Sequence, residues 1–148
     1  PVANFSGSTR PGAGIYYTDR ADLTLTGDWK LPAGQKIILL VKGNVVIESD
    51  IEVPTDSFFL LVAGGNLTFA PSVKKAQGIF IAGQTLATGG GNESFEGQGG
   101  FVGLAVNLER QGSNATQPGE KFIYRPDFWL NSPVELQIQS HLWEEIAP

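Results

Sequence analysis

Three acidic residues, Glu48, Asp50 and Glu52, alternate along one short run of the chain. On a β-strand, alternate side chains point to the same face, so these carboxylates would face solvent while Ile47, Ile51 and Val53 face the core. Glycoside hydrolysis uses two carboxyl groups about 5–10 Å apart, which makes this run the best candidate for a glycan hydrolase or lyase. Catalysis would also need a groove and a raised pKa on one acid. Because neither has a signal in the sequence, we interpret the run as a solvated strand face and predict no catalytic residue.

A second group of oxygen ligands, Asn92, Glu93 and Glu96, follows three consecutive glycines. Calcium takes carboxylate and amide oxygens of this kind. The spacing matches neither a hand-type calcium loop nor the nonapeptide of calcium-binding solenoids. We therefore predict no metal and no cofactor, and we keep the three residues only as candidate ligand contacts. The single histidine, His141, stands beside apolar residues and is interpreted as a surface or packing residue.

Two tryptophans, Trp29 and Trp129, are further candidates for contact with a ligand. Large aromatic side chains anchor many binding surfaces. Both rings could equally be core or cap residues, and we favour that interpretation.

The charge balance excludes several classes of partner. The 148 residues carry a net charge of −5, with a pI near 4.8, whereas nucleic acids and anionic membranes bind clustered Lys and Arg. The apolar runs, such as Ile37 to Val41, are far shorter than the roughly 20 residues that span a bilayer. We predict no nucleic-acid partner and no membrane span. Since the chain begins at Pro1 and has no Met, we interpret it as a fragment or a mature form.

An internal repeat organises the chain. Four apolar segments, each closed by a small residue, begin at Leu39, Leu60, Ile79 and Phe101, so their first residues lie 21, 19 and 22 positions apart. A period near 20 residues is typical of solenoids. We predict an all-β, right-handed parallel β-helix of about four to five rungs, a rung being one full turn of the coil. The rungs occupy residues 23–110, with the first at Leu23, in a single domain of residues 1–148.

Two residue types recur at the predicted corners. Gly43, Gly64 and Gly83 follow the apolar segments, and a sharp corner calls for a positive φ or a close approach of backbones. Asn44 and Asn66 come soon after two of these glycines. Their amides would form a ladder between rungs or simply tolerate the turn geometry, and both readings stay open.

Other architectures compete with the solenoid. An antiparallel sandwich or barrel also has short strands separated by frequent turn signals. A βαβ fold needs a crossover helix of a dozen or so residues, and no helical stripe lies between the repeats. The repeat favours the solenoid over both.

Several segments are expected to modify the coil. Residues 88–100 hold six glycines in thirteen positions, which predicts a projecting, mobile loop. The strands at residues 37–41 and 58–62 are apolar at successive positions, which predicts cover on their outer face. The N-terminal segment and a C-terminal cap at about residues 120–148 are the candidates for covering the coil and its ends.

Residues 133–146 fit both an amphipathic helix and an alternating strand, and both stay open.

The C-terminal tail carries more particular motifs: a Tyr-x-Pro at Tyr124 to Pro126, a later Pro133 and a Trp-x-Glu at Trp143 to Glu145. These motifs follow the predicted solenoid rungs. In this arrangement the chain resembles the C-terminal β-solenoid domains of large bacterial surface proteins and pilus-associated, minor-pilin-like proteins. It lacks the hydrophobic N-terminal helix by which pilins anchor.

The resemblance implies a non-catalytic structural or adhesive module, extracellular or at the cell surface. Its partners would be other protein subunits or cell-surface glycans. One alternative is a glycan-active enzyme or carbohydrate-binding β-helix. The other is a self-assembling scaffold, a homo-oligomer joined through the solenoid ends.

Overall fold

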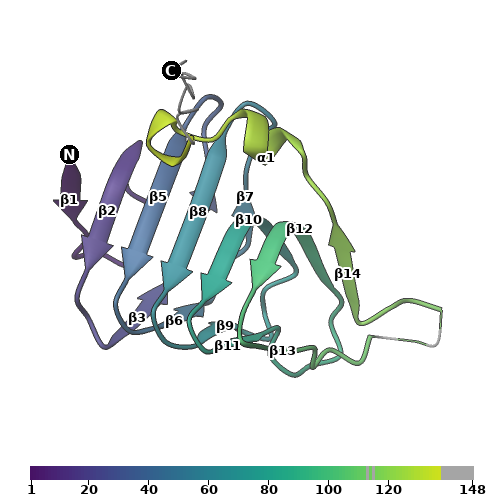
Figure 1. Cartoon of the computed structure of the whole chain (residues 1–148). Coiled ribbons are helices and arrows are strands. Elements are labelled where there is room, and N and C mark those ends of the chain that lie inside the picture. Colours follow the sequence, from purple (N-terminus) through teal and green to yellow (C-terminus); the bar gives the residue numbers. More distant parts are fainter. Residues whose placement is uncertain (113, 115, 138–148) are drawn as a thin grey trace, which may run out of the picture.

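The chain folds as a parallel β-solenoid, which confirms the predicted architecture (Figure 1). The computed structural model describes residues 1–112, 114 and 116–137. All pairings between its strands are parallel. The smaller sheet, β13-β11-β9-β6-β3, takes one strand from each rung, so about five rungs stack.

Each rung has three sides. The first side is built from β2 (Gly14–Thr18), β5 (Lys36–Val41), β8 (Phe58–Ala63) and the second halves of β10 (Lys75–Ala82) and β12 (Phe95–Val102), with β1 (Val2–Asn4) at its edge. The second side is built from β3 (Asp22–Leu25), β6 (Asn44–Ile47), β9 (Leu67–Phe69), β11 (Thr85–Ala87) and β13 (Ala105–Asn107). The third side contains β4 (Trp29–Lys30), β7 (Ile51–Glu52), the first halves of β10 and β12, and β14 (Glu120–Ile123).

The strand register corrects the predicted alignment at two of its three steps. Leu60 pairs with Ile79 as predicted, but Leu39 pairs with Leu61. Ile79 pairs with Gly100 instead of the predicted Phe101, so this step is also shifted by one residue. Because side chains alternate between faces, a one-residue slip would turn the core row outward. The observed register instead stacks Leu39, Leu61 and Phe80, which are all fully buried.

The corner glycines are required by close backbone approach. Gly43, Gly64 and Gly83 have ordinary φ angles. A Cβ on any of them would collide with a backbone carbonyl oxygen of the preceding rung. Gly78 and Gly99 serve differently, because they have positive φ angles of 144° and 127° where β10 and β12 pass from the third side to the first.

The asparagines after the corners form a ladder. Asn44 Nδ2 donates to Asp22 Oδ1 at 2.9 Å, and Asn44 Oδ1 accepts from the N–H of Asn66 at 2.9 Å. Asn66 Oδ1 accepts in turn from the N–H of Thr85 at 3.1 Å. Each side-chain oxygen thus bonds the backbone of the next rung, and the ladder reading holds at Asn44 and Asn66.

An aromatic row runs along the axis of the coil. Ring centroids lie 5.7 Å apart for Trp29 and Phe59, 5.8 Å for Phe59 and Phe80, and 5.1 Å for Phe80 and Phe101. The row ends at Phe122, 5.1 Å from Phe101. Neighbouring rungs therefore share one continuous core.

The second part of the glycine-rich stretch is a strand, so its prediction as a projecting loop was wrong for Phe95 to Gly100. These residues belong to β12, which pairs with β10 and β14. A Cβ at Gly97 would collide with the rings of Phe101 and Phe122. Glycine here makes room for the aromatic core instead of providing mobility.

Part of the outer face of the first side, around Ile38, Leu60 and Ile79, is covered by the chain from residue 124 to residue 137, as predicted for the C-terminal cap (Figure 1). This segment, called the strap below, contains α1 (Asp127–Leu130) and a 3-10 turn at Val134–Leu136. Of residues 133–146, the described part is therefore neither a long helix nor a strand, and residues 138–148 lie outside the described residues. At the other end of the coil, Phe5 of the N-terminal segment is buried.

Candidate functional site

The three acids proposed for glycan chemistry do not lie on one strand. Glu48 and Asp50 fall in the corner between β6 and β7, and Glu52 is on β7. Asp50 Oδ1 accepts from the N–H groups of Lys74 and Lys75, at 2.7 and 3.1 Å. The expected burial of Ile47, Ile51 and Val53 behind these acids is confirmed.

The candidate calcium ligands are drawn into separate contacts. Glu93 pairs with Lys74 at 3.0 Å, and Glu96 pairs with Lys121 at 3.5 Å. A hydrogen bond from Gln98, supported by the charge of Lys121, lowers the pKa of Glu96. Asn92 is exposed in the turn before β12. Within the described residues, no group of three or more His, Cys, Asp or Glu is placed to hold a metal ion.

The two tryptophans have opposite environments. Trp29 is 1% exposed and its Nε1 donates to the carbonyl of Thr26 at 3.0 Å. This confirms the favoured interpretation of Trp29 as a core residue and removes it from the candidate ligand contacts. Trp129 on α1 is 62% exposed. It lines an apolar recess of about 230 Å³ between the strap and residues such as Leu60 and Ile79. His141 lies outside the described residues.

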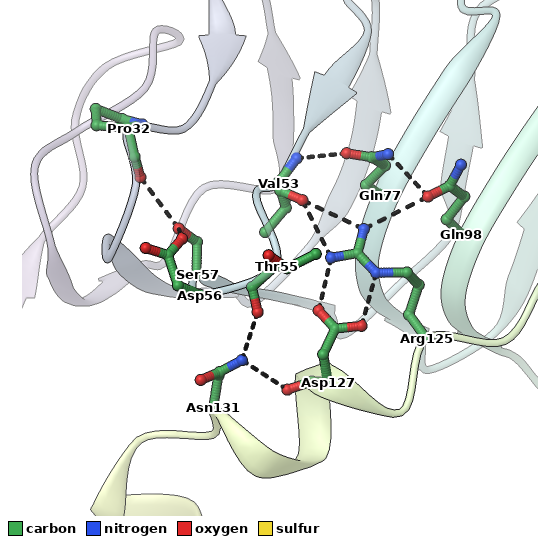
Figure 2. Close-up of polar contacts among 10 residues, drawn as sticks. All are labelled: Pro32, Val53, Thr55, Asp56, Ser57, Gln77, Gln98, Arg125, Asp127 and Asn131. Carbon is green, nitrogen blue, oxygen red and sulfur yellow. Dashed lines mark hydrogen bonds and ion pairs between the residues drawn. The ribbon is translucent and has the colours of Figure 1, made fainter.

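The strap is locked to the third side by a polar cluster (Figure 2). Arg125 makes a bidentate ion pair with Asp127, at 2.7 and 2.6 Å, and donates to the carbonyl of Val53 at 3.2 and 3.3 Å. Its guanidinium lies 4.4 Å from the centre of the Phe128 ring. The hydrogen bond from Arg125 holds the pKa of Asp127 below its usual value. Asn131 adds a hydrogen bond of 2.6 Å to the carbonyl of Thr55.

Glutamines extend this cluster into the sheet (Figure 2). Gln77 Oε1 accepts from the N–H of Val53 at 2.6 Å, and Gln77 Nε2 donates to Gln98 Oε1 at 2.8 Å. The same oxygen of Gln98 accepts from Arg125 at 3.4 Å. These polar groups satisfy one another, which makes the cluster a fastening between the strap and the coil.

Arg110 is a buried charged residue whose role the sequence pattern did not predict. It is only 5% exposed, and burial lowers the pKa of its guanidinium. Its donors reach four backbone carbonyls around a corner of the coil. One feature of the sequence could have drawn attention to Arg110: Glu109 and Arg110 are the only charged residues between Glu96 and Glu120.

The C-terminal end of the coil is open. β14 pairs with β12 only from Phe95 to Gln98, and among the described strands none pairs with the outer edge of the second half of β12 or of β13. Large apolar side chains are exposed there, namely Val102, Leu104, Val106, Leu108 and Phe122. A recess of about 330 Å³ at their centre is lined by Gly99, Phe101, Val106, Leu108 and Phe122. The end of the aromatic row therefore meets solvent.

No protein-family model, curated protein or solved structure matches the chain. Within the residues that the structure describes, no helix is long and apolar enough to cross a membrane.

Proposed function

We propose that the chain is a non-catalytic structural module of an extracellular protein, associated with a cell surface or a pilus. The proposal is supported by a core that continues without a break from rung to rung and by a strap fastened across the outside. A solenoid of this kind resists bending because each rung packs on its neighbours. The compartment is the part of the proposal that rests on the resemblance of the tail.

The non-catalytic role is supported by the contacts that the side chains of Asp50 and Glu52 make. Asp50 accepts two backbone hydrogen bonds from the following rung. Glu52 lies 3.5 Å from Lys30 of the preceding rung. A carboxylate tuned for general acid catalysis is usually desolvated, which raises its pKa. Asp50 and Glu52 make polar contacts between neighbouring rungs at the surface.

A polysaccharide digestion assay tests this role. The whole chain is incubated with neutral and acidic polysaccharides, and new reducing ends are measured. We expect no release above that of a heat-denatured sample. Release that disappears in both Asp50→Asn and Glu52→Gln, with unchanged melting temperatures, would establish the glycan-active alternative and overturn the proposal.

The proposed location has its own test. Antibodies raised against this chain should label intact cells that produce the protein, and external protease should remove the label. Labelling only after the cells are permeabilised would contradict an extracellular role.

A further inference from the structure

The open end of the coil presents an unpaired strand edge. β13 pairs with β11 and with no other strand among those described. The N–H of Ala105 donates to the carbonyl of Gln84, and the carbonyl of Asn107 accepts from the N–H of Thr88. Because backbone groups alternate in direction along a strand, the N–H and C=O of Val106 point toward the open edge. Unpaired edges of this kind are templates for a strand from another chain.

The sequence along this edge is symmetric about Val106. Leu104 and Leu108 lie two residues to either side, with Ala105 and Asn107 between. The three apolar side chains are 88%, 46% and 56% exposed in chain order. In an antiparallel pair centred on Val106, Leu104 of one copy would face Leu108 of the other, and the two Val106 residues would face each other. The edge is therefore complementary to itself.

The N-terminal end of the coil does not offer a matching apolar surface. Phe5 is buried, and the residues that follow it, Ser6 to Thr9, are polar or glycine. Ser8 accepts from the N–H of Thr26, just after the edge strand β3. In β1 the one large apolar side chain is Val2. Since apolar surface is buried most favourably against apolar surface, the best described partner for the C-terminal end is the same end of a second copy.

We propose that two copies of this chain join through their C-terminal coil ends, with β13 pairing antiparallel to β13 about a two-fold axis at Val106. The two Val106 residues exchange two N–H···O=C bonds across the axis. Leu104, Leu108 and the recess lined by Phe101 and Phe122 are covered by their counterparts. This contact is isologous, so it closes at two copies and does not propagate into a filament. The proposal rests on the structural role proposed above and names its partner.

Sedimentation and light scattering over a range of concentrations test the contact. We expect a mass of twice the 15.8 kDa chain at high concentration. Leu104→Asp should raise the dissociation constant by about 100-fold, because it places an unpaired carboxylate in an apolar contact. Leu130→Asp is the matched control, since Leu130 on α1 is 83% exposed and outside the coil end. It should leave the dissociation constant within about threefold of the wild-type value.

The geometry is tested with single cysteines, because the chain has no cysteine of its own. Residues that exchange both hydrogen bonds in an antiparallel pair have Cα atoms about 5.5 Å apart, which a disulfide spans. Val106→Cys should therefore form a disulfide-linked dimer under mild oxidation. Val46→Cys is the control, because Val46 on β6 is 37% exposed but lies away from the coil end. It should stay monomeric on a non-reducing gel.

Contrary results separate the hypotheses. A monomer at every concentration, or equal cross-linking of Val106→Cys and Val46→Cys, overturns the contact and leaves the structural role standing. A dimer that resists Leu104→Asp but is lost in Val2→Asp points to the N-terminal end and also overturns it. Polysaccharide cleavage by the isolated chain would overturn the structural role without affecting the dimer measurement.

Discussion

Arg110 provides the sharpest test of how the coil is held together. Its Nε donates to the carbonyl of Thr88 at 2.8 Å, and its Nη2 donates to that of Ala70 at 2.8 Å. Its Nη1 donates to the carbonyls of Pro71 and Glu93, at 3.0 and 3.2 Å. One side chain thus ties the corner after β9 to the two segments that flank the turn before β12. We expect Arg110→Met to keep the apolar stem and remove all four bonds.

The size of the effect follows from burial. A hydrogen bond to a charged group contributes about 1.5–3 kcal/mol. Ala70, Pro71 and Glu93 are not buried, so their carbonyls can bind water once the guanidinium is gone, and the full sum is not lost. Methionine also gives up the contact of the guanidinium with the Phe95 ring, 5.6 Å from its centre. We expect Arg110→Met to lower the free energy of unfolding by about 3–5 kcal/mol.

Urea unfolding followed by circular dichroism measures this loss, with the slope of the transition checked for partial unfolding of the coil. Arg20→Met is the matched control, because Arg20 donates one exposed bond of 2.8 Å to the carbonyl of Ser6. It should cost less than about 1 kcal/mol. If the two variants lose stability equally, Arg110 does not hold the corner and the reasoning from its four bonds is refuted.

Three further predictions concern the strap, the corners and the ladder. Arg125 lowers the pKa of Asp127 below its ordinary 3.8, so the ion pair stabilises the fold above that pH and is lost as pH falls through the folded-state pKa. Thermal melts should show Asp127→Asn destabilised by roughly 1 kcal/mol at neutral pH, with a gap to wild type that closes in acid. Gly64→Ala should cost about 2–3 kcal/mol in urea unfolding, and Gly90→Ala, where a Cβ meets open space, less than about 0.5; equal losses would contradict the close approach at the corner. Asn66→Ala should cost about 1 kcal/mol by the same measurement and Asn66→Asp less, because aspartate keeps the acceptor; equal costs would rule out the ladder as the cause.

Much of the architecture was predictable from local pattern. A period near 20 residues indicates stacked rungs because each rung must repeat the same sequence of strand, corner and strand. Continuous apolar runs at Ile37 to Val41 and Phe58 to Val62 indicated two covered faces, and the strap covers one of them. The corner glycines were expected for a positive φ or for close backbone approach, and the structure shows close approach without a positive φ at Gly43, Gly64 and Gly83.

Register and the glycine-rich stretch could not be predicted in this way. A shift of one residue changes the face of every side chain, but similar apolar residues at successive positions hide the shift in the sequence. Leu39 therefore aligned with Leu60 instead of its partner Leu61. Gly97 is glycine because two rings from other parts of the chain occupy the space of its Cβ, and no local pattern encodes that contact.

The sequence by itself determined the repeat, the net negative charge and the corners that the chain must turn. Only the tertiary structure decided what the remaining polar and apolar residues do. The partners of Arg110 lie 17 to 40 positions away, and those of Arg125 include Val53, 72 positions away. Whether Leu104, Val106 and Leu108 meet solvent depends on where the last rung stops. Burial and long-range contact are properties of the folded coil, so these roles became visible only with the fold.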